Sequence, residues 1–150
     1  MDEKKELLNL LIVDDDEDDC LMIKNALEEC NVIIKTQFLH NGEELLNYLH
    51  KRGKYSQLST DSLPCLIFLD LNMPKKDGRE ALKEIKSNSL FRRIPIVIMT
   101  TSKSREDIFQ TYDIGVNSFI TKPSSYKLLV EYIMAIKKYW LQIVNLPDTN

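Results

Sequence analysis

Five residues whose side chains could bind a metal ion or an anion each follow or end a short apolar stretch of the chain. They are Asp14, Asp15, Asp70, Thr100 and Lys122. An oxygen-rich pocket without imidazole or thiolate suits Mg²⁺, which prefers carboxylate, carbonyl and water ligands. Because converging carboxylates repel one another, a divalent cation and a lysine ammonium are the natural compensation. In the metal-free protein we expect this crowding to raise the pKa of at least one of the three carboxyl groups.

The apolar stretches that precede these residues predict β-strands, because they are too short for ordinary helices and rich in β-branched side chains. The predicted strands cover residues 10–13, 32–39, 65–69, 94–100 and 118–121. Apolar residues at helical spacing separate the strands and predict helices. These helices cover residues 18–30, a segment from Gly42, a segment from Gly78, a segment capped by Ser104, and residues 124–144. Residues 51–63 are polar with little periodicity and predict a loop or a ragged helix end.

Five successive strand–helix units predict an α/β fold with a doubly wound parallel sheet and helices on both faces. In such sheets, ligands bind outside the carboxyl ends of the strands. The five candidate residues are therefore expected to meet at one edge of the sheet. A length of 150 residues indicates one domain, with a core over about residues 8–144 and flexible ends.

The composition is that of a soluble globular protein, with 43% hydrophobic and 29% charged residues. The net charge is −3 and no Lys/Arg run resembles a nucleic-acid-binding arm, so we expect no nucleic-acid partner. The amino-terminal segment lacks a signal-peptide core and no apolar stretch could span a bilayer, which predicts a cytoplasmic protein without a membrane partner. The three cysteines form no C-x-x-C pair and are expected in the core.

Each candidate residue taken alone has an ordinary structural explanation. An acidic run at a helix start is usually solvated and interacts with the helix dipole, which is the expected role of Glu17, Asp18 and Asp19. Asp14 and Asp15 differ because they directly follow a buried strand. The convergence of the five candidates at one sheet edge favours a functional site over these separate explanations.

The chain resembles a receiver domain of two-component response regulators over nearly its whole length. The matching stretches are LLIVDDDEDD, CLIFLDLNMPKKDGREAL, IPIVIMTTS and FITKP. The resemblance implies a flavodoxin-like receiver fold with strand order 2-1-3-4-5. The chain departs from the family pattern in a longer stretch between Asn41 and Cys65. This departure, with the segments TTSKSREDI and YWLQIVNLP, resembles the single-domain regulators that partner bacterial phytochromes.

The resemblance implies a phosphoryl acceptor and a metal site. Asp70 would accept a phosphoryl group from a histidine kinase, and the likeness to phytochrome-partnered regulators makes a phytochrome-type sensor a candidate for that kinase. Asp15, Asp70 and the backbone carbonyl of Asn72 would hold Mg²⁺, with Asp14 acting through water, and Mn²⁺ could substitute. Thr100 and Lys122 would each bind a phosphoryl oxygen.

The resemblance also implies a switch and an output surface. Thr100 and the ring of Phe119 would move together on phosphorylation, and Asn72 and Ser102 would tune dephosphorylation. The remodelled surface would comprise the fourth helix, the fifth strand and the fifth helix, which would contact a downstream protein. The chain would then be a signalling protein, not an enzyme, and would assist only its own phosphorylation and dephosphorylation.

Two other functions fit parts of the sequence. A Mg²⁺-dependent phosphohydrolase of the haloacid dehalogenase type could use residues 14–16 as its D-x-D motif, but Asp18 stands where Thr or Val is expected and Asp70 would have no role. A degenerate receiver used only as a scaffold is the second alternative. The intact acidic pair and the presence of Asp70, Thr100 and Lys122 speak against it.

The predicted last helix is longer than the sheet and is apolar nearly all round at its end, where only Gln142 is polar between residues 139 and 144. A helix that is hydrophobic on every side is normally covered. The chain's own Leu7 and Leu8 could cover it, but we favour a homodimer packed through this helix about a two-fold axis. The expected interface residues are Tyr132, Tyr139, Trp140 and Ile143.

Overall fold

A five-stranded parallel sheet forms the centre of the computed structural model, which describes residues 9–58 and 63–147. The strands are β1 (Asn9–Val13), β2 (Lys35–Leu39), β3 (Leu66–Leu69), β4 (Ile96–Thr100) and β5 (Ser118–Thr121). Their order in the sheet is β2-β1-β3-β4-β5. The predicted doubly wound fold and its strand order are therefore confirmed.

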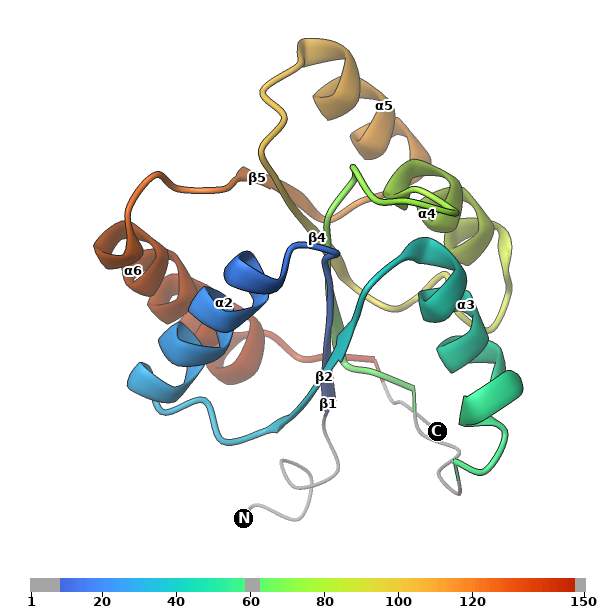
Figure 1. Cartoon of the computed structure of the whole chain (residues 1–150), viewed down its shortest axis with the longest axis horizontal. Coiled ribbons are helices and arrows are strands. Elements are labelled where there is room, and N and C mark those ends of the chain that lie inside the picture. The colour runs from blue at the N-terminus through green and yellow to red at the C-terminus, as the bar shows by residue number, and fades with distance from the viewer. Residues whose placement is uncertain (1–8, 59–62, 148–150) are drawn as a thin grey trace.

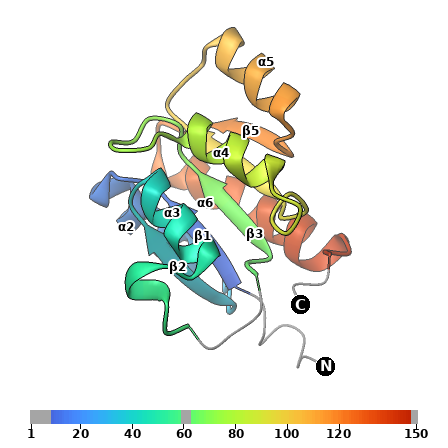
Figure 2. The same cartoon turned by 90° about the vertical axis from the view of Figure 1, so that its right-hand side faces the viewer.

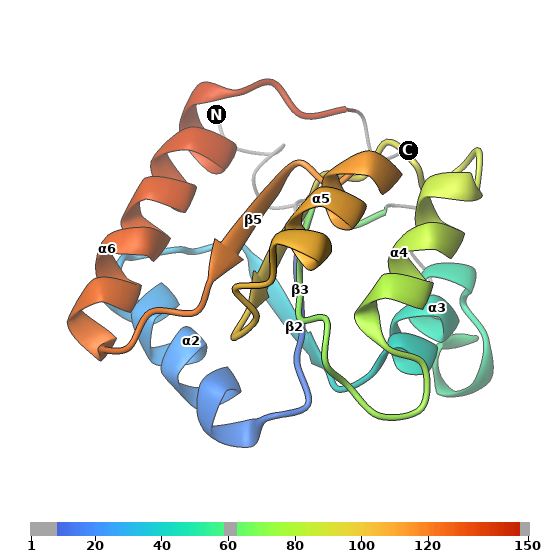
Figure 3. The ribbon, with the colours of Figure 1, turned by 90° about the horizontal axis from the view of Figure 1, so that it is seen from above.

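Helices cover both faces of the sheet (Figures 1 and 3). The α-helices are α2 (Glu17–Glu29), α3 (Gly42–His50), α4 (Gly78–Ser87), α5 (Arg105–Ile114) and α6 (Tyr126–Ile136). A 3₁₀ turn, η1 (Gly53–Tyr55), follows α3, and a π-helical segment, η2 (Lys137–Ile143), continues α6. Helices α2 and α6 lie side by side on one face, and α3 and α4 lie on the other with α5 beside α4 (Figure 2).

The buried strands divide their side chains between two core layers because successive residues of a strand point to opposite faces. On β1, Leu11 and Val13 pack toward α3 and α4, whereas Leu10 and Ile12 pack toward α2 and α6. All residues of β1, β3 and β4 are buried, as expected for strands covered on both faces. The three cysteines are also buried, as predicted. Among the described residues, no helix has the length and apolarity that crossing a membrane requires.

Each α-helix begins directly after a side chain that caps it. The capping residues are Asp16, Asn41, Asp77, Ser104 and Ser125, and each side chain accepts a hydrogen bond from the backbone N–H three residues later. Such caps satisfy helix donors that have no partner within the helix. The caps therefore fix where the helices start, immediately beyond the loops at the carboxyl edge of the sheet.

Two predicted strands begin two or more residues too early in the sequence, and the third strand, predicted from Cys65, begins one residue too early. Residues 32–34 do not join β2, because Asn31 adopts a positive φ of 56° and the N–H of Val32 donates to the carbonyl of Leu27 to close α2. Ile94 likewise lies outside β4, since its N–H donates to the carbonyl of Phe91. Within the predicted loop 51–63, the described part holds η1, and residues 59–62 lie outside the described residues.

The predicted long last helix is confirmed in extent, because α6 and η2 together run from Tyr126 to Ile143, but its end is wound as a π-helix and part of its apolar surface is covered by the core. A π-helix has more residues per turn than an α-helix, so the side chains of η2 are rotated relative to a continued α6. Trp140 and Leu141 pack against the core layer beneath α2 and α6, whereas Tyr139 and Ile143 remain 53% and 60% exposed. Tyr132 is half-buried. Leu7, Leu8 and the ends expected to be flexible lie outside the described residues.

Candidate functional site

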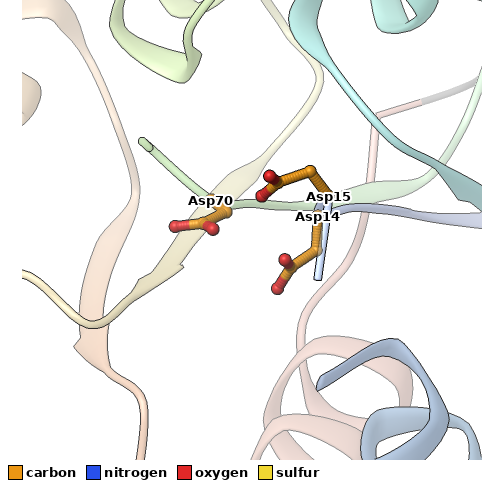
Figure 4. Close-up of side chains that lie close together, drawn as sticks. All are labelled: Asp14, Asp15 and Asp70. Atoms are coloured by element: carbon orange, nitrogen blue, oxygen red, sulfur yellow. The ribbon is translucent and has the colours of Figure 1, made fainter. Parts of the chain in front are cut away.

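Three carboxylates meet at the carboxyl edge of the sheet (Figure 4). Asp14 and Asp15 directly follow β1, and Asp70 directly follows the neighbouring strand β3. One carboxylate oxygen from each residue lies within 4.8 Å of the other two. Asp14 and Asp70 are buried, with 2% and 6% of their surface exposed, whereas Asp15 is exposed. The structure thus brings together the three acidic residues that the sequence singled out.

Lys122 joins this cluster from the end of β5. Its Nζ lies 2.7 Å from Oδ2 of Asp14, 2.7 Å from Oδ2 of Asp19 and 3.4 Å from Oδ2 of Asp70. The contact with Asp19 corrects the sequence interpretation, which gave Asp19 only a role at the helix start. Asp19 lies in the first turn of α2, and helices that follow strands in this fold begin at the edge where ligands bind.

The pKa values of Asp14 and Lys122 are shifted at this site. Desolvation raises the pKa of Asp14 to about 6, and hydrogen bonds from Lys122 and from the N–H of Asp16 offset burial only in part. The charge of Asp70 adds a smaller contribution, so the predicted rise in pKa is present but burial, not crowding, is its main cause. Burial also lowers the pKa of Lys122, but hydrogen bonds to Asp14 and Asp19 outweigh it, and the pKa lies above its ordinary value.

The donor set fits a divalent cation with oxygen ligands. Oδ1 of Asp70 is buried and has no hydrogen-bond partner among the described residues, which is costly for a carboxylate oxygen unless a ligand binds it. The three carboxylates offer only oxygen, the donor type that hard cations prefer. Asn72 is exposed in the loop after Asp70.

Thr100 and the loop after it form a second part of the site. Thr100 is completely buried at the end of β4, and its Oγ1 accepts a long hydrogen bond of 3.4 Å from the N–H of Ser102. Oγ of Ser102 donates to Asp107 at 2.7 Å, and Arg79 donates two hydrogen bonds, of 2.9 and 2.8 Å, to the same carboxylate. No sequence pattern marks Arg79 or Asp107, because their contact joins α4 and α5 across 28 residues of chain.

Two further residues near the site are Phe119 on β5 and Gly78 at the start of α4. Phe119 lies on β5, is half-buried against the core layer beneath α3 and α4, and donates its N–H to the hydroxyl of Tyr112 at 3.2 Å. Gly78 begins α4 so close to the carbonyl of Asp70 that a Cβ at this position would clash with the backbone. Glycine at this position lets α4 pack directly behind Asp70.

Comparison with known proteins assigns the chain to a family. The sequence model of the response regulator receiver domain matches residues 10–134. Response regulator Rcp1 of Synechocystis is 36% identical over 138 residues, which are 92% of each chain. The crystal structure of the phosphorylated cyanobacterial phytochrome response regulator RcpA superposes with a TM-score of 0.86 at 39% identity and covers 94% of this chain and 99% of its own. The Mn²⁺-bound form of Rcp1 superposes with a TM-score of 0.85 at 36% identity, covering 93% and 99%. The chain belongs to the response regulator receiver family.

Proposed function

We propose that the chain is a single-domain response regulator that accepts a phosphoryl group on Asp70 from a histidine kinase in a Mg²⁺-dependent reaction. The observation that carries this proposal is the state of the Asp70 carboxylate. Asp70 directly follows the central strand, one of its carboxylate oxygens is buried without a partner among the described residues, and the other lies 3.4 Å from the Lys122 ammonium. One Asp70 oxygen forms a bond to phosphorus while the bond from phosphorus to the kinase histidine nitrogen breaks.

The residues around Asp70 supply positioning and charge neutralisation, which are the main needs of phosphoryl transfer. During the transfer, the Lys122 ammonium exchanges its hydrogen bond to Asp70 for a hydrogen bond to a phosphoryl oxygen. The hydroxyl of Thr100 binds a second phosphoryl oxygen. Asp15, Asp70 and the carbonyl of Asn72, with Asp14 acting through water, would hold Mg²⁺, and the cation would supply charge neutralisation at the phosphoryl oxygens. The Mn²⁺-bound form of the relative Rcp1 supports a divalent cation at this site.

Phosphorylation changes the output surface through Thr100. When its hydroxyl turns to the phosphoryl group, Thr100 gives up the 3.4 Å contact with Ser102, and Phe119 moves into the space behind it. Asn72 and Ser102 tune dephosphorylation. The affected surface comprises α5, β5 and α6, and on α5 Phe109 is 72% and Tyr112 is 48% exposed. Such exposed aromatic side chains support contact with a downstream protein.

The proposed source of the phosphoryl group is a phytochrome-type histidine kinase, and the chain is proposed to act in the cytoplasm. The choice of kinase is supported by the likeness to RcpA and to the bacteriophytochrome response regulator AtBRR, which superposes with a TM-score of 0.75 at 32% identity. The chain acts in signalling and not as an enzyme with a separate substrate. The family assignment favours this function over the haloacid dehalogenase-type phosphohydrolase considered above.

A phosphoryl-donor experiment separates the proposed function from both alternatives. With Mg²⁺ and acetyl phosphate, we expect stoichiometric phosphorylation that EDTA prevents, because the cation neutralises the charge of the incoming group. Intact-protein mass spectrometry measures the phosphorylated fraction, and phosphate release from p-nitrophenyl phosphate measures turnover. Sustained turnover of the monoester would support the phosphohydrolase, and failure to phosphorylate would support the scaffold.

The chain is also proposed to form a homodimer through the exposed part of η2. Tyr139 and Ile143 offer apolar surface there, whereas Trp140 contributes mainly to the core. We expect the combined variant Tyr139→Lys and Ile143→Glu to shift the protein from dimer to monomer in light scattering at micromolar concentration. Gln142→Glu, an exposed change on the same segment, serves as the control. A monomeric wild type would rule out this dimer.

A further inference from the structure

We infer that Asp19 is a positioning residue that holds the Lys122 ammonium at the site throughout the phosphoryl cycle. The inference rests on the proposed function of Asp70 and adds a residue to it. The ammonium of a lysine has three N–H donors, and three carboxylates surround that of Lys122. Asp14 and Asp19 each lie 2.7 Å from Nζ, and Asp70 lies 3.4 Å from it.

The three partners of Lys122 differ in what else they must bind. Asp14 and Asp70 belong to the carboxylate cluster that fits a divalent cation, and Asp70 is also the proposed acceptor. A bound cation competes with the ammonium for both carboxylates, and phosphorylation replaces the Asp70 carboxylate by an acyl phosphate whose charge lies on the phosphoryl oxygens. Asp19 lies outside the cluster of possible metal ligands found among the described residues. It is therefore the partner that Lys122 can keep when the cation and the phosphoryl group are both present.

Asp19 is held in place by the start of α2. Its N–H donates to the side chain of the capping residue Asp16 at 3.0 Å, and the helix behind it is anchored in the core. The side chains of Asp19 and Lys122 are 25% and 12% exposed. Partial removal from water strengthens the attraction between opposite charges. The pair is thus a fixed contact between the first turn of α2 and the residue after β5.

Loss of the Asp19 charge should release Lys122 toward the other two carboxylates. The ammonium would then compete more strongly with a divalent cation for Asp14 and Asp70. The ordinary alternative is that Asp19 only interacts with the positive end of the helix dipole. Asp18 separates these explanations, because it carries the same charge in the same helical turn but is exposed and lies outside the group of carboxylates around Lys122.

The experiment is a calorimetric titration of Mg²⁺ into wild type, Asp19→Asn, Asp18→Asn and Asp19→Glu. We expect Asp19→Asn to weaken Mg²⁺ binding by about three- to tenfold, and Asp18→Asn by less than about twofold, since only Asp19 restrains the ammonium. Asp19→Glu should recover part of the affinity because it restores the carboxylate. Equal effects of Asp19→Asn and Asp18→Asn would overturn the inference.

A double-mutant cycle tests whether Asp19 acts through Lys122. In a Lys122→Met background, Asp19→Asn and Asp18→Asn should have the same small effect on Mg²⁺ affinity. A persistent difference between them would also overturn the inference. With Mg²⁺ and beryllofluoride, which stands in for the phosphoryl group, NMR should detect the Lys122 ammonium. We expect Asp19→Asn to change its chemical shift and Asp18→Asn to leave that shift unchanged. Failure of acetyl phosphate to modify wild type would reject the proposed function instead, and the metal titrations do not depend on that modification.

Discussion

Replacing Asp14 with asparagine should stabilise the metal-free protein by about 2 to 3 kcal/mol at pH 7.5. Burial raises the pKa of Asp14 from 3.8 to about 6, even with Lys122 beside it. At roughly 1.4 kcal/mol for each pH unit that a pKa moves, ionised Asp14 destabilises the folded state by about 3 kcal/mol. Asparagine has nearly the same shape but no charge to desolvate, and its carbonyl can still accept the hydrogen bond from the N–H of Asp16.

The pH dependence of this gain follows from the direction of the pKa shift. Between about pH 4 and pH 6 the folded state binds more protons at Asp14 than the unfolded state, so the contribution of Asp14 to stability falls as pH rises through this window. Above pH 6 the full cost is present. The advantage of Asp14→Asn should therefore shrink to roughly half at pH 5 and to a small remainder near pH 4.

Urea denaturation in EDTA at about pH 7.5, 5 and 4 measures the change in the free energy of unfolding. The matched control is Asp15→Asn. Asp15 carries the same charge one residue later but is exposed, so its replacement should change the free energy of unfolding much less. A destabilised Asp14→Asn variant at pH 7.5 would show that the contact with Lys122 outweighs burial. In excess Mg²⁺, wild type should become more stable than Asp14→Asn, since binding of the cation adds more to the free energy of unfolding of wild type.

The sequence predicted the sheet and the convergence of the site because both follow from strong local patterns. Buried strands read as continuous apolar runs, and a parallel order places residues such as Asp14 and Asp70 at the same edge. The pattern predicted the first residues of the strands less well. Apolar residues such as Val32 and Ile94 fit the start of a strand and also the turn that they close in the structure. Only the hydrogen bonds of the fold decide between these outcomes.

The features that the sequence could not predict depend on contacts between distant segments. Asp19 sits in an acidic run where every residue could serve a helix start, and its pairing with Lys122 spans 103 residues. The π-helical turn after Ile136 also has no local signal. Its apolar residues fit a regular helix equally well, and the altered winding accompanies the packing of Trp140 and Leu141 on the core.

Asp70→Asn should remove phosphorylation completely. Asparagine keeps the shape of the buried side chain but lacks the negatively charged oxygen that must attack phosphorus. The other acidic residues of the site are not expected to take over, because Asp70 is the carboxylate among the described residues that has a buried oxygen without a hydrogen-bond partner. We expect acetyl phosphate with Mg²⁺ to modify wild type and to leave Asp70→Asn at background, with Asp77→Asn as a control at the cap of α4.

Chemical mapping of the phosphorylated residue tests the central claim most directly. Borohydride reduces an aspartyl phosphate to homoserine, and peptide mass spectrometry locates the converted residue. The proposed function predicts homoserine at position 70 in phosphorylated wild type, and no conversion when EDTA is present or acetyl phosphate is omitted. Conversion at Asp14, Asp15 or another carboxylate, with Asp70 intact, would contradict it.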